Sequence, residues 1–261
     1  MAFEAIDWQR PWLEPLRETG EMLTRSDDWV AAANAMASAR GLYNPAGLPI
    51  VFVPQQDLPA GTPYEAHIAA TGHVPTRDNL HDFFNALIWL HFPQTKCELN
   101  GLHRKAAAQP VQPGTRGSQR DAATLFDENS AIFVSTEVGT LNALQRRDWK
   151  GVLLKPPADF HDSCQVVLFG HALLEKLVSP YKSITAHVWT CSVDKEWMTL
   201  PPARRLADLD ARIAEGVRGG FTSADFCHLP VLGVPGWWPA QDEAFYGDAE
   251  VFRPPRAASR K

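Results

Sequence analysis

Hydrophobic and polar positions follow a helical period in two consecutive stretches of the chain, NLHDFFNALIWLH and TKCELNGLH. In the first stretch, apolar residues recur every three or four positions, which predicts a helix over 79–92 with one buried face. Pro93 follows, and because a proline restricts the residue before it, the pattern predicts that the helix ends there. Thr95 and Glu98 have the T-x-x-E spacing of a capping box, which predicts a second helix over 95–108. We therefore expect an adjacent pair of helices that form a hairpin with a tight corner.

The rest of the chain mixes short apolar runs with further helical periods. Short apolar runs bounded by Gly or Pro are typical of buried strands, and longer periodic segments are typical of amphipathic helices. The predicted strands are 47–55, 131–135, 164–170 and 183–193, the predicted helices are 26–41, 140–148, 171–180 and 203–220, and 67–76 is expected to be a connector. This order lacks a regular β-α-β alternation. It predicts an α+β fold, one domain over 1–261 with the helical hairpin packed against a small mixed sheet, and α/β is the alternative.

Two segments depart from regular patterning. The stretch 109–120, QPVQPGTRGSQR, has the composition of a loop. The tail 229–253 has too many Pro and Gly residues for long elements, yet it follows Phe226 and carries several large rings that are too apolar to leave in water. We expect this tail to pack on the body as ordered coil, and we expect 256–261 to be flexible.

Composition and charge narrow the class of protein. Hydrophobic residues make up 45% and charged residues 21% of the chain, as in a globular protein with a sizeable core. The net charge of -5 makes nucleic acid an unlikely partner, because such proteins usually carry a basic surface. No apolar run approaches the roughly 18 residues of a membrane span, so no membrane association is expected. The N-terminus does not resemble a signal peptide and the four cysteines are far apart, which predicts a cytoplasmic protein with free thiols.

The helical pair carries more polar side chains than a core requires. His81 and Asn85 are four positions apart and lie side by side at the border of the apolar face, with Asp82 further round. On the second helix, His103 shares the inner face and Asn100 lies beside it. If the two helices form a hairpin, these side chains converge on one cleft.

Imidazoles with carboxylate or amide neighbours suit two kinds of chemistry. They bind a divalent metal such as Zn, Mn or Fe, and they also serve as general acids and bases. His81, Asp82 and His103 are therefore candidate catalytic residues, and Asn85 and Asn100 are candidates to orient substrate or water. The alternative is a structural role, because buried Asn and His side chains commonly bond helix ends and loop carbonyls.

Further candidates lie outside the helical pair. Asp127 and Glu128 precede a predicted strand, where carboxylates often act as ligands or bases, although such residues also stabilise turns. His171 lies where a strand enters a helix, a common position for site residues, which makes it a candidate to bind substrate; the alternative is a tight turn with His171 near a helix cap. His187 shares a strand face with Thr185 and Trp189, which forms either a polar pocket wall or a solvated face, and Trp237 of the PGWW segment is a candidate aromatic wall.

The common catalytic motifs are absent from the sequence. It contains no G-x-S-x-G, G-x-x-x-x-G-K-[ST] or H-E-x-x-H, and no G-x-G-x-x-G follows a predicted strand. This argues against serine hydrolases of the α/β type, P-loop NTPases, zinc proteases of the common type and dehydrogenases that bind dinucleotides.

Four long segments resemble one protein family. VPTRDNLHDFFNALIWLHFPQTKCELNGLH, LFDENSAIF, FGHALLEKLVSPYKSITAH and LPVLGVPGWWPAQDEAFYGDAEVFRP are similar to the uncharacterised bacterial family catalogued as domain of unknown function 3025. The resemblance spans about 29–253 and implies a bacterial protein. It implies no activity, cofactor or catalytic residue.

Two functional hypotheses follow from the residues themselves. The first is a metal-dependent hydrolase with a cleft lined by His, Asp and Asn side chains. The second is a non-catalytic module that binds a small molecule or a peptide, with the polar residues forming a structural network.

Overall fold

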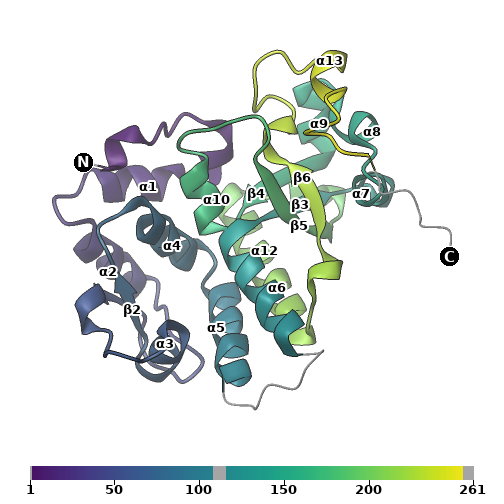
Figure 1. Ribbon diagram of the computed structural model, residues 1–261. Coiled ribbons are helices and arrows are strands. Elements are labelled where there is room, and N and C mark those ends of the chain that lie inside the picture. The colour runs from purple at the N-terminus through teal and green to yellow at the C-terminus, as the bar shows by residue number, and fades with distance from the viewer. Residues whose placement is uncertain (1, 108–115, 255–261) are drawn as a thin grey trace.

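A four-stranded mixed sheet forms the centre of the C-terminal part of this computed structural model, which describes residues 2–107 and 116–254 (Figure 1). The strand order is β4-β3-β5-β6. β3 is antiparallel to β4 and parallel to β5, and β6 is antiparallel to β5. The strands are β3 Ser130–Ser135, β4 Cys164–Leu168, β5 Thr185–Ser192 and β6 Cys227–Pro230. Every residue of β3 is buried, as expected of a central strand covered on both faces.

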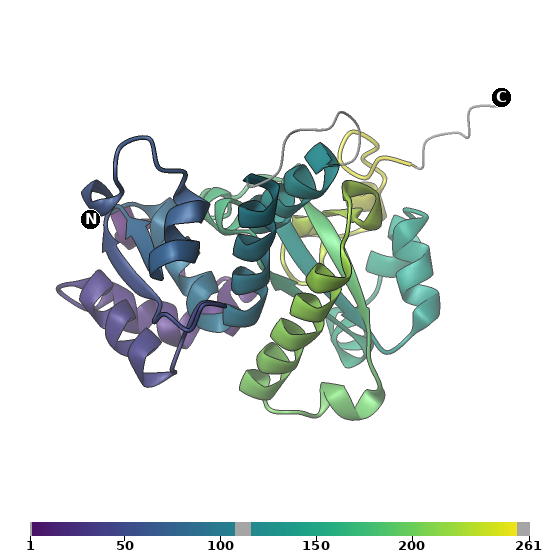
Figure 2. The same ribbon diagram turned by 90° about the horizontal axis from the view of Figure 1, so that it is seen from below.

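Helices cover both faces of this sheet. The long helix α12 lies across one face, as Figure 2 shows, together with α6. Its inner stripe of Leu206, Leu209, Ile213 and Val217 is buried, as the 3.6-residue period predicts. Gly216 lets α12 approach β5 closely, because a Cβ there would lie 2.3 Å from the Trp189 ring. The helices of this half are α6 Arg116–Asn129, α7 Val138–Gln145, α8 Trp149–Leu153, α9 Pro157–Ser163, α10 His171–Lys176, α11 Lys195–Met198, α12 Pro202–Gly219 and α13 Glu243–Tyr246.

The N-terminal part is mainly helical, with a small second sheet. Its elements are α1 Arg17–Thr24, α2 Trp29–Ala39, β1 Val51–Pro54, α3 Tyr64–Thr71, β2 His73–Thr76, α4 Leu80–His91 and α5 Pro93–Ala107. Asp28 caps α2 by accepting a hydrogen bond from the backbone of Ala31. β1 and β2 pair in parallel. The expectation of a connector over 67–76 is therefore wrong, because this segment holds most of α3 and all of β2.

The predicted pair of helices is confirmed, but the predicted capping box is wrong. α4 ends at His91 and α5 begins at Pro93, so the chain turns between them. The first turn of α5 is capped by Asp210 of α12, whose carboxylate accepts hydrogen bonds from the backbone N–H groups of Gln94 (3.0 Å) and Thr95 (2.8 Å). Glu98 instead forms an ion pair with Arg218. A partner more than a hundred residues away replaces the local cap.

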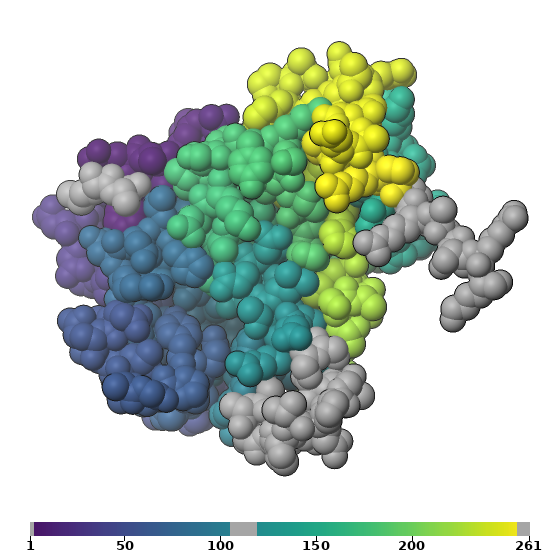
Figure 3. All heavy atoms as spheres, viewed as in Figure 1, coloured from purple at the N-terminus to yellow at the C-terminus, as the bar shows by residue number. Residues whose placement is uncertain are grey.

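The C-terminal tail packs on the body, as predicted. Its large rings at Trp237, Phe245, Tyr246 and Phe252 are buried, as is Phe226 just before it. In the space-filling view, the yellow end of the described chain lies against the green and teal segments (Figure 3). The tail also contains the end of β6 and all of α13, which the expectation of plain coil did not include.

The predicted α+β class is confirmed by the helices and the mixed sheet. The expected flexible end at 256–261 lies outside the described residues, as does most of the expected loop at 109–120, of which 116–120 belong to α6. Among the described residues, no helix is both long enough and apolar enough to span a membrane.

Candidate metal centre

The sheet register brings the end of α6 next to the start of α10. β3 follows α6 directly, and β4 ends just before α10. Because β3 and β4 are antiparallel, with Ala131 opposite Leu168, the start of β3 meets the end of β4. The backbone N–H groups of Phe169 and Gly170 both donate to the carbonyl of Ser130, at 3.1 and 2.9 Å. Glu128 on α6 and His171 on α10 therefore lie close together.

Gly170 is required for this approach. A Cβ at this position would lie 2.4 Å from the backbone nitrogen of Ser130 and 2.6 Å from that of Asn129. Backbone atoms in a central strand cannot move aside, so only glycine fits. The residue that precedes His171 thus sets how near α10 comes to β3.

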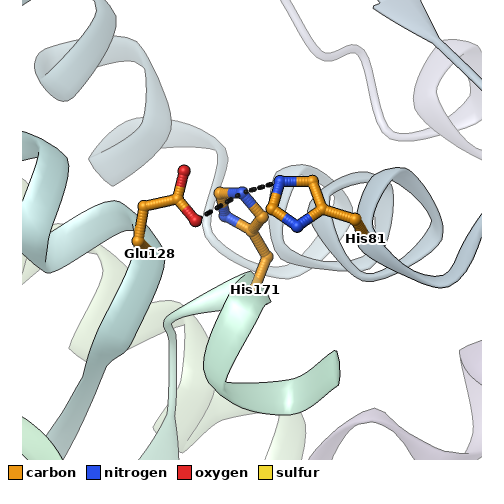
Figure 4. A group of neighbouring side chains, drawn as sticks. All are labelled: His81, Glu128 and His171. Carbon is orange, nitrogen blue, oxygen red and sulfur yellow. Dashed lines mark hydrogen bonds and ion pairs between the residues drawn. The ribbon is translucent and has the colours of Figure 1, made fainter. Parts of the chain in front are cut away.

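His81, Glu128 and His171 form a compact group, shown in Figure 4. Nε2 of His171 lies 3.1 Å from Nε2 of His81 and 3.5 Å from Oε2 of Glu128. One ligand atom from each residue lies within 4.8 Å of the other two. The group combines two imidazoles and one carboxylate, a donor set that suits zinc or iron.

Glu175 orients His81 from the opposite side of the ring. Nδ1 of His81 lies 3.0 Å from Oε2 of Glu175, which is one helical turn after His171 on α10. A carboxylate can only accept here, so this hydrogen bond places a proton on Nδ1 of His81. In the neutral ring, Nε2 then presents its lone pair to His171. A carboxylate that holds a histidine in this tautomer is a common outer partner of metal ligands.

The three side chains differ in their access to solvent. The side chain of His171 is only 5% exposed, whereas those of His81 and Glu128 are 31% and 40% exposed. Burial lowers the pKa of His171 to about 4, so its ring is neutral at pH 7 and able to act as a ligand. Burial also raises the pKa of Glu128, and the neighbouring Asp127 carboxylate adds to this shift. The group is thus dry on the His171 side and open to water on the other.

A buried ionic network lies behind His171. The ammonium group of Lys96, on α5, donates to both carboxylate oxygens of Asp127, at 2.6 and 2.8 Å, and to Oδ1 of Asn85 at 2.9 Å. Asn85 in turn donates to the hydroxyl of Tyr64 at 3.2 Å. Burial alone would raise the pKa of Asp127, but the charge of Lys96 and its hydrogen bond outweigh burial and lower the pKa. Oδ2 of Asp127 lies 4.0 Å from Nδ1 of His171.

The structure therefore brings together five of the predicted site residues. His81, Glu128 and His171 lie in the metal-type group, while Asp127 and Asn85 form the network behind it. Their roles in catalysis or substrate binding stay predictions.

Three predicted residues on the same helices have other surroundings. The carboxylate of Asp82 accepts hydrogen bonds from the backbone N–H and from the guanidinium of Arg77, at 2.7 to 3.1 Å. Asn100 donates to the backbone carbonyl of Glu65 at 2.7 Å and to its carboxylate at 2.6 Å. His103 is half-buried on α5 and is not a member of the three-residue group.

The last two predicted residues lie apart from this group. His187 is on β5 with its ring 4.9 Å from that of His228, on the adjacent β6. Trp237 is buried against Trp12, with ring centroids 6.0 Å apart. Trp237 therefore lies in a packed aromatic contact within the described chain.

Sequence reasoning missed Glu175 and Lys96. Glu175 follows His171 by four positions, so the sequence did contain the signal that both share one helix face. Lys96 carried no such signal, because a lysine near a helix start is normally exposed. Its burial arises from α6, which supplies Asp127 from 31 positions away.

Comparison with known proteins identifies a family but no activity. The family model described as "Protein of unknown function (DUF3025)" matches residues 50–256. This match covers more than half of the chain and includes every residue of the metal-type group. No curated protein and no solved structure matches the chain.

Proposed function

The chain belongs to the DUF3025 family, and we propose that it is a metal-dependent hydrolase in which His81, Glu128 and His171 bind a divalent transition metal. The single observation that carries the proposal is the facing pair of histidine Nε2 atoms beside a carboxylate. Glu175 places the proton of His81 on the far nitrogen, and with the His171 proton on Nδ1 the two Nε2 lone pairs and the Glu128 carboxylate point at one small space. Such a concentration of acceptors is stabilised by a cation.

The spacing of the donor atoms fits a single ion. With metal–ligand bonds near 2.1 Å, two neighbouring ligands of one ion are about 3.0 to 3.4 Å apart. The two Nε2 atoms are 3.1 Å apart, and the shortest distance from His171 to Glu128 is 3.5 Å. Small side-chain shifts are enough to bring all three donors to bonding distance.

The open side of the group supports hydrolysis. Three protein ligands leave at least one position of a tetrahedral ion for water. A bound metal of this kind lowers the pKa of that water and polarises a substrate carbonyl or phosphoryl oxygen. His171 holds its position from the buried side, while the partial exposure of the His81 and Glu128 side chains leaves room for water and a substrate to reach the ion.

The competing arrangement contains no ion. In it, Nδ1–H of His81 donates to Glu175, Nε2–H of His171 donates to Nε2 of His81, and the group is one end of a structural polar network. The hydrogen bonds that Asn85 and Asn100 form with other protein groups favour a scaffold role for those two residues in either case. A non-catalytic binding module is the function that corresponds to this arrangement.

Metal analysis of the purified protein separates the two. We expect close to one zinc, manganese or iron ion per chain in the wild type, and Co²⁺ reconstitution should give visible d–d absorption. His81→Ala, His171→Ala and Glu128→Gln should each lose the ion, and His187→Ala is the matched control because it removes a histidine outside the group. Hydrolysis of p-nitrophenyl phosphate and p-nitrophenyl acetate by the reconstituted protein then tests the catalytic half of the proposal.

Thermal melting gives an independent measure. A ligand present at one hundred times its Kd adds about 2.7 kcal/mol to the free energy of unfolding. For a chain of this size each kcal/mol raises Tm by roughly 2–4 °C, so chelation should lower Tm by about 5–10 °C in the wild type. An unchanged Tm on chelation, together with a metal content near zero, would refute the metal site and leave the polar scaffold.

A further inference from the structure

A cavity is lined by residues of β5 and β6 and by none of the three residues of the His81 group. Its volume is about 720 Å³, which is in the range of small-molecule pockets. Thr185 and His187 of β5 line it, as do Arg147, Trp149 and Arg253. Thr185 and His187 of the predicted polar strand face thus line this cavity, whereas Trp189 of the same face packs against Phe126.

The side chains that line this cavity are mostly hydrogen-bond donors. Arg147 and Arg253 contribute two guanidinium groups and Ser183 contributes a hydroxyl, whereas the Thr185 hydroxyl already donates to the carbonyl of Ser183 at 3.2 Å. Arg147 donates to the backbone carbonyl of Pro254 at 3.5 Å, and Arg253 donates to that of Glu250 at 3.1 Å. Within the described part of the chain, neither guanidinium group forms an ion pair with a carboxylate. Glu250 is the single carboxylate in the lining. The permanent charges of the lining therefore sum to a positive value.

Arg147 occupies a backbone position that favours glycine. Its φ is 58°, in the left-handed region. Arg147 directly follows Arg146, the C-cap of α7. The backbone N–H of Arg147 donates to the carbonyl of Leu144 at 2.9 Å, and the N–H of Asp148 donates to the carbonyl of Ala143 at 3.0 Å. This is the Schellman arrangement, in which glycine is the usual residue. An arginine here is strained, and such strain is commonly found at binding sites.

From the cavity, its donors and the strained arginine, we infer that this pocket binds a small phosphorylated compound. A phosphate monoester has three terminal oxygens that accept hydrogen bonds, which matches two guanidinium forks with a nearby hydroxyl. The apolar part of the compound would lie against Trp149, whose indole N–H is already bonded to the carbonyl of Arg253 at 2.8 Å. A carboxylate, with fewer acceptor oxygens, satisfies fewer of these donors. The inference does not depend on the metal-dependent activity.

Calorimetric titration with phenyl phosphate tests this inference, with the full chain in the presence of a chelator so that no metal binds the probe. We expect saturable binding to one site in the wild type, at least tenfold tighter than binding of benzoate. Arg147→Gly and Arg253→Gln should each weaken binding at least tenfold. Arg146→Gln is the matched control, because it removes the same charge from the adjacent exposed residue, and it should change Kd less than twofold.

Arg147→Gly also separates binding from folding. Glycine relieves the left-handed strain, so this variant should melt at or above the wild-type Tm while its affinity falls. Absence of saturable binding in the wild type, an equal loss in Arg146→Gln, or benzoate binding as tight as phenyl phosphate would each overturn the inference. His171→Ala should bind phenyl phosphate as the wild type does, and a loss of binding there would place the phosphate at the other group and overturn it as well.

Discussion

Replacement of Lys96 by methionine removes the only cation that directly contacts Asp127 through hydrogen bonds in the described structure. Lys96 is 4% exposed and Asp127 is 9% exposed, and the ammonium reaches both carboxylate oxygens. Methionine keeps most of the length and apolar contact of the lysine stem but provides no donor. The carboxylate then stays in a dry environment without its hydrogen-bonded cation.

The expected cost is large for a single substitution. Removal of one partner of a buried ion pair typically costs 3–5 kcal/mol. A second estimate gives a cost of similar size. If the unpaired Asp127 takes up a proton instead of staying charged, protonating a carboxyl of usual pKa near 3.9 at pH 7 costs about 4 kcal/mol. We therefore expect Lys96→Met to lower the free energy of unfolding by about 4 kcal/mol, which is a large part of the total stability of a typical domain.

A double-mutant cycle isolates the interaction. In Lys96→Met combined with Asp127→Leu, both charges are gone, and only Oδ1 of Asn85 loses a hydrogen bond, at about 1–3 kcal/mol. We expect the double variant to be at least 2 kcal/mol more stable than the sum of the single changes predicts. The assay is urea unfolding followed by circular dichroism, with a chelator present to remove any contribution from bound metal.

Two outcomes would refute this reasoning. If Lys96→Met costs less than about 1 kcal/mol, water or a rearranged cation reaches Asp127 and the pair is not desolvated as described. If the two changes are additive within about 0.5 kcal/mol, the residues do not interact energetically despite their contact.

Three further predictions concern the helix cap, the pH dependence of stability and the approach of α10. Asp210→Ala leaves two backbone N–H groups at the start of α5, including that of Thr95, without an acceptor, and should cost about 2–3 kcal/mol in urea unfolding. Burial, followed by the charge of Arg40, lowers the pKa of His91 to about 4, so the folded protein binds fewer protons than the unfolded chain between pH 6.5 and 4. His91 alone should contribute a fall of about 3 kcal/mol in the free energy of unfolding as the pH drops through that window, and His91→Leu should have a shallower pH dependence in the same unfolding assay. Gly170→Ala should be destabilised by more than about 2 kcal/mol and should lose metal binding, measured by metal content, because its Cβ would collide with the β3 backbone.

Local sequence patterns predicted the elements better than their contacts. The period of apolar residues was enough to predict α4 and α12, and Pro93 was enough to predict the break before α5. The cap of α5 was predicted incorrectly because Asp210 provides it from 115 positions away in sequence. Helix-capping patterns describe residues that are close along the chain. The Asp210 carboxylate comes close to the start of α5 only after α12 has packed on α5.

The candidate site shows the same limit. His81, Glu128 and His171 were all recognisable as unusual polar residues in apolar surroundings, but the sequence favoured His103 rather than His171 as the partner of His81. That choice assumed that α4 and α5 face each other as a closed hairpin. The partner of His81 instead comes from α10, which is placed by the register of β4 on β3. The local period of apolar residues cannot predict the register between two strands that are about thirty residues apart in sequence.

The wide separation of the three residues along the chain also has a consequence for biosynthesis. His81 and His171 are 90 positions apart, and Glu175, which orients His81, comes later still. A nascent chain therefore cannot assemble this group until α10 has been synthesised and β4 has paired with β3. Any ion that the group binds would be acquired after most of the chain has emerged. Incomplete fragments that end before His171 would lack the site, so metal loading would report that the sheet has formed.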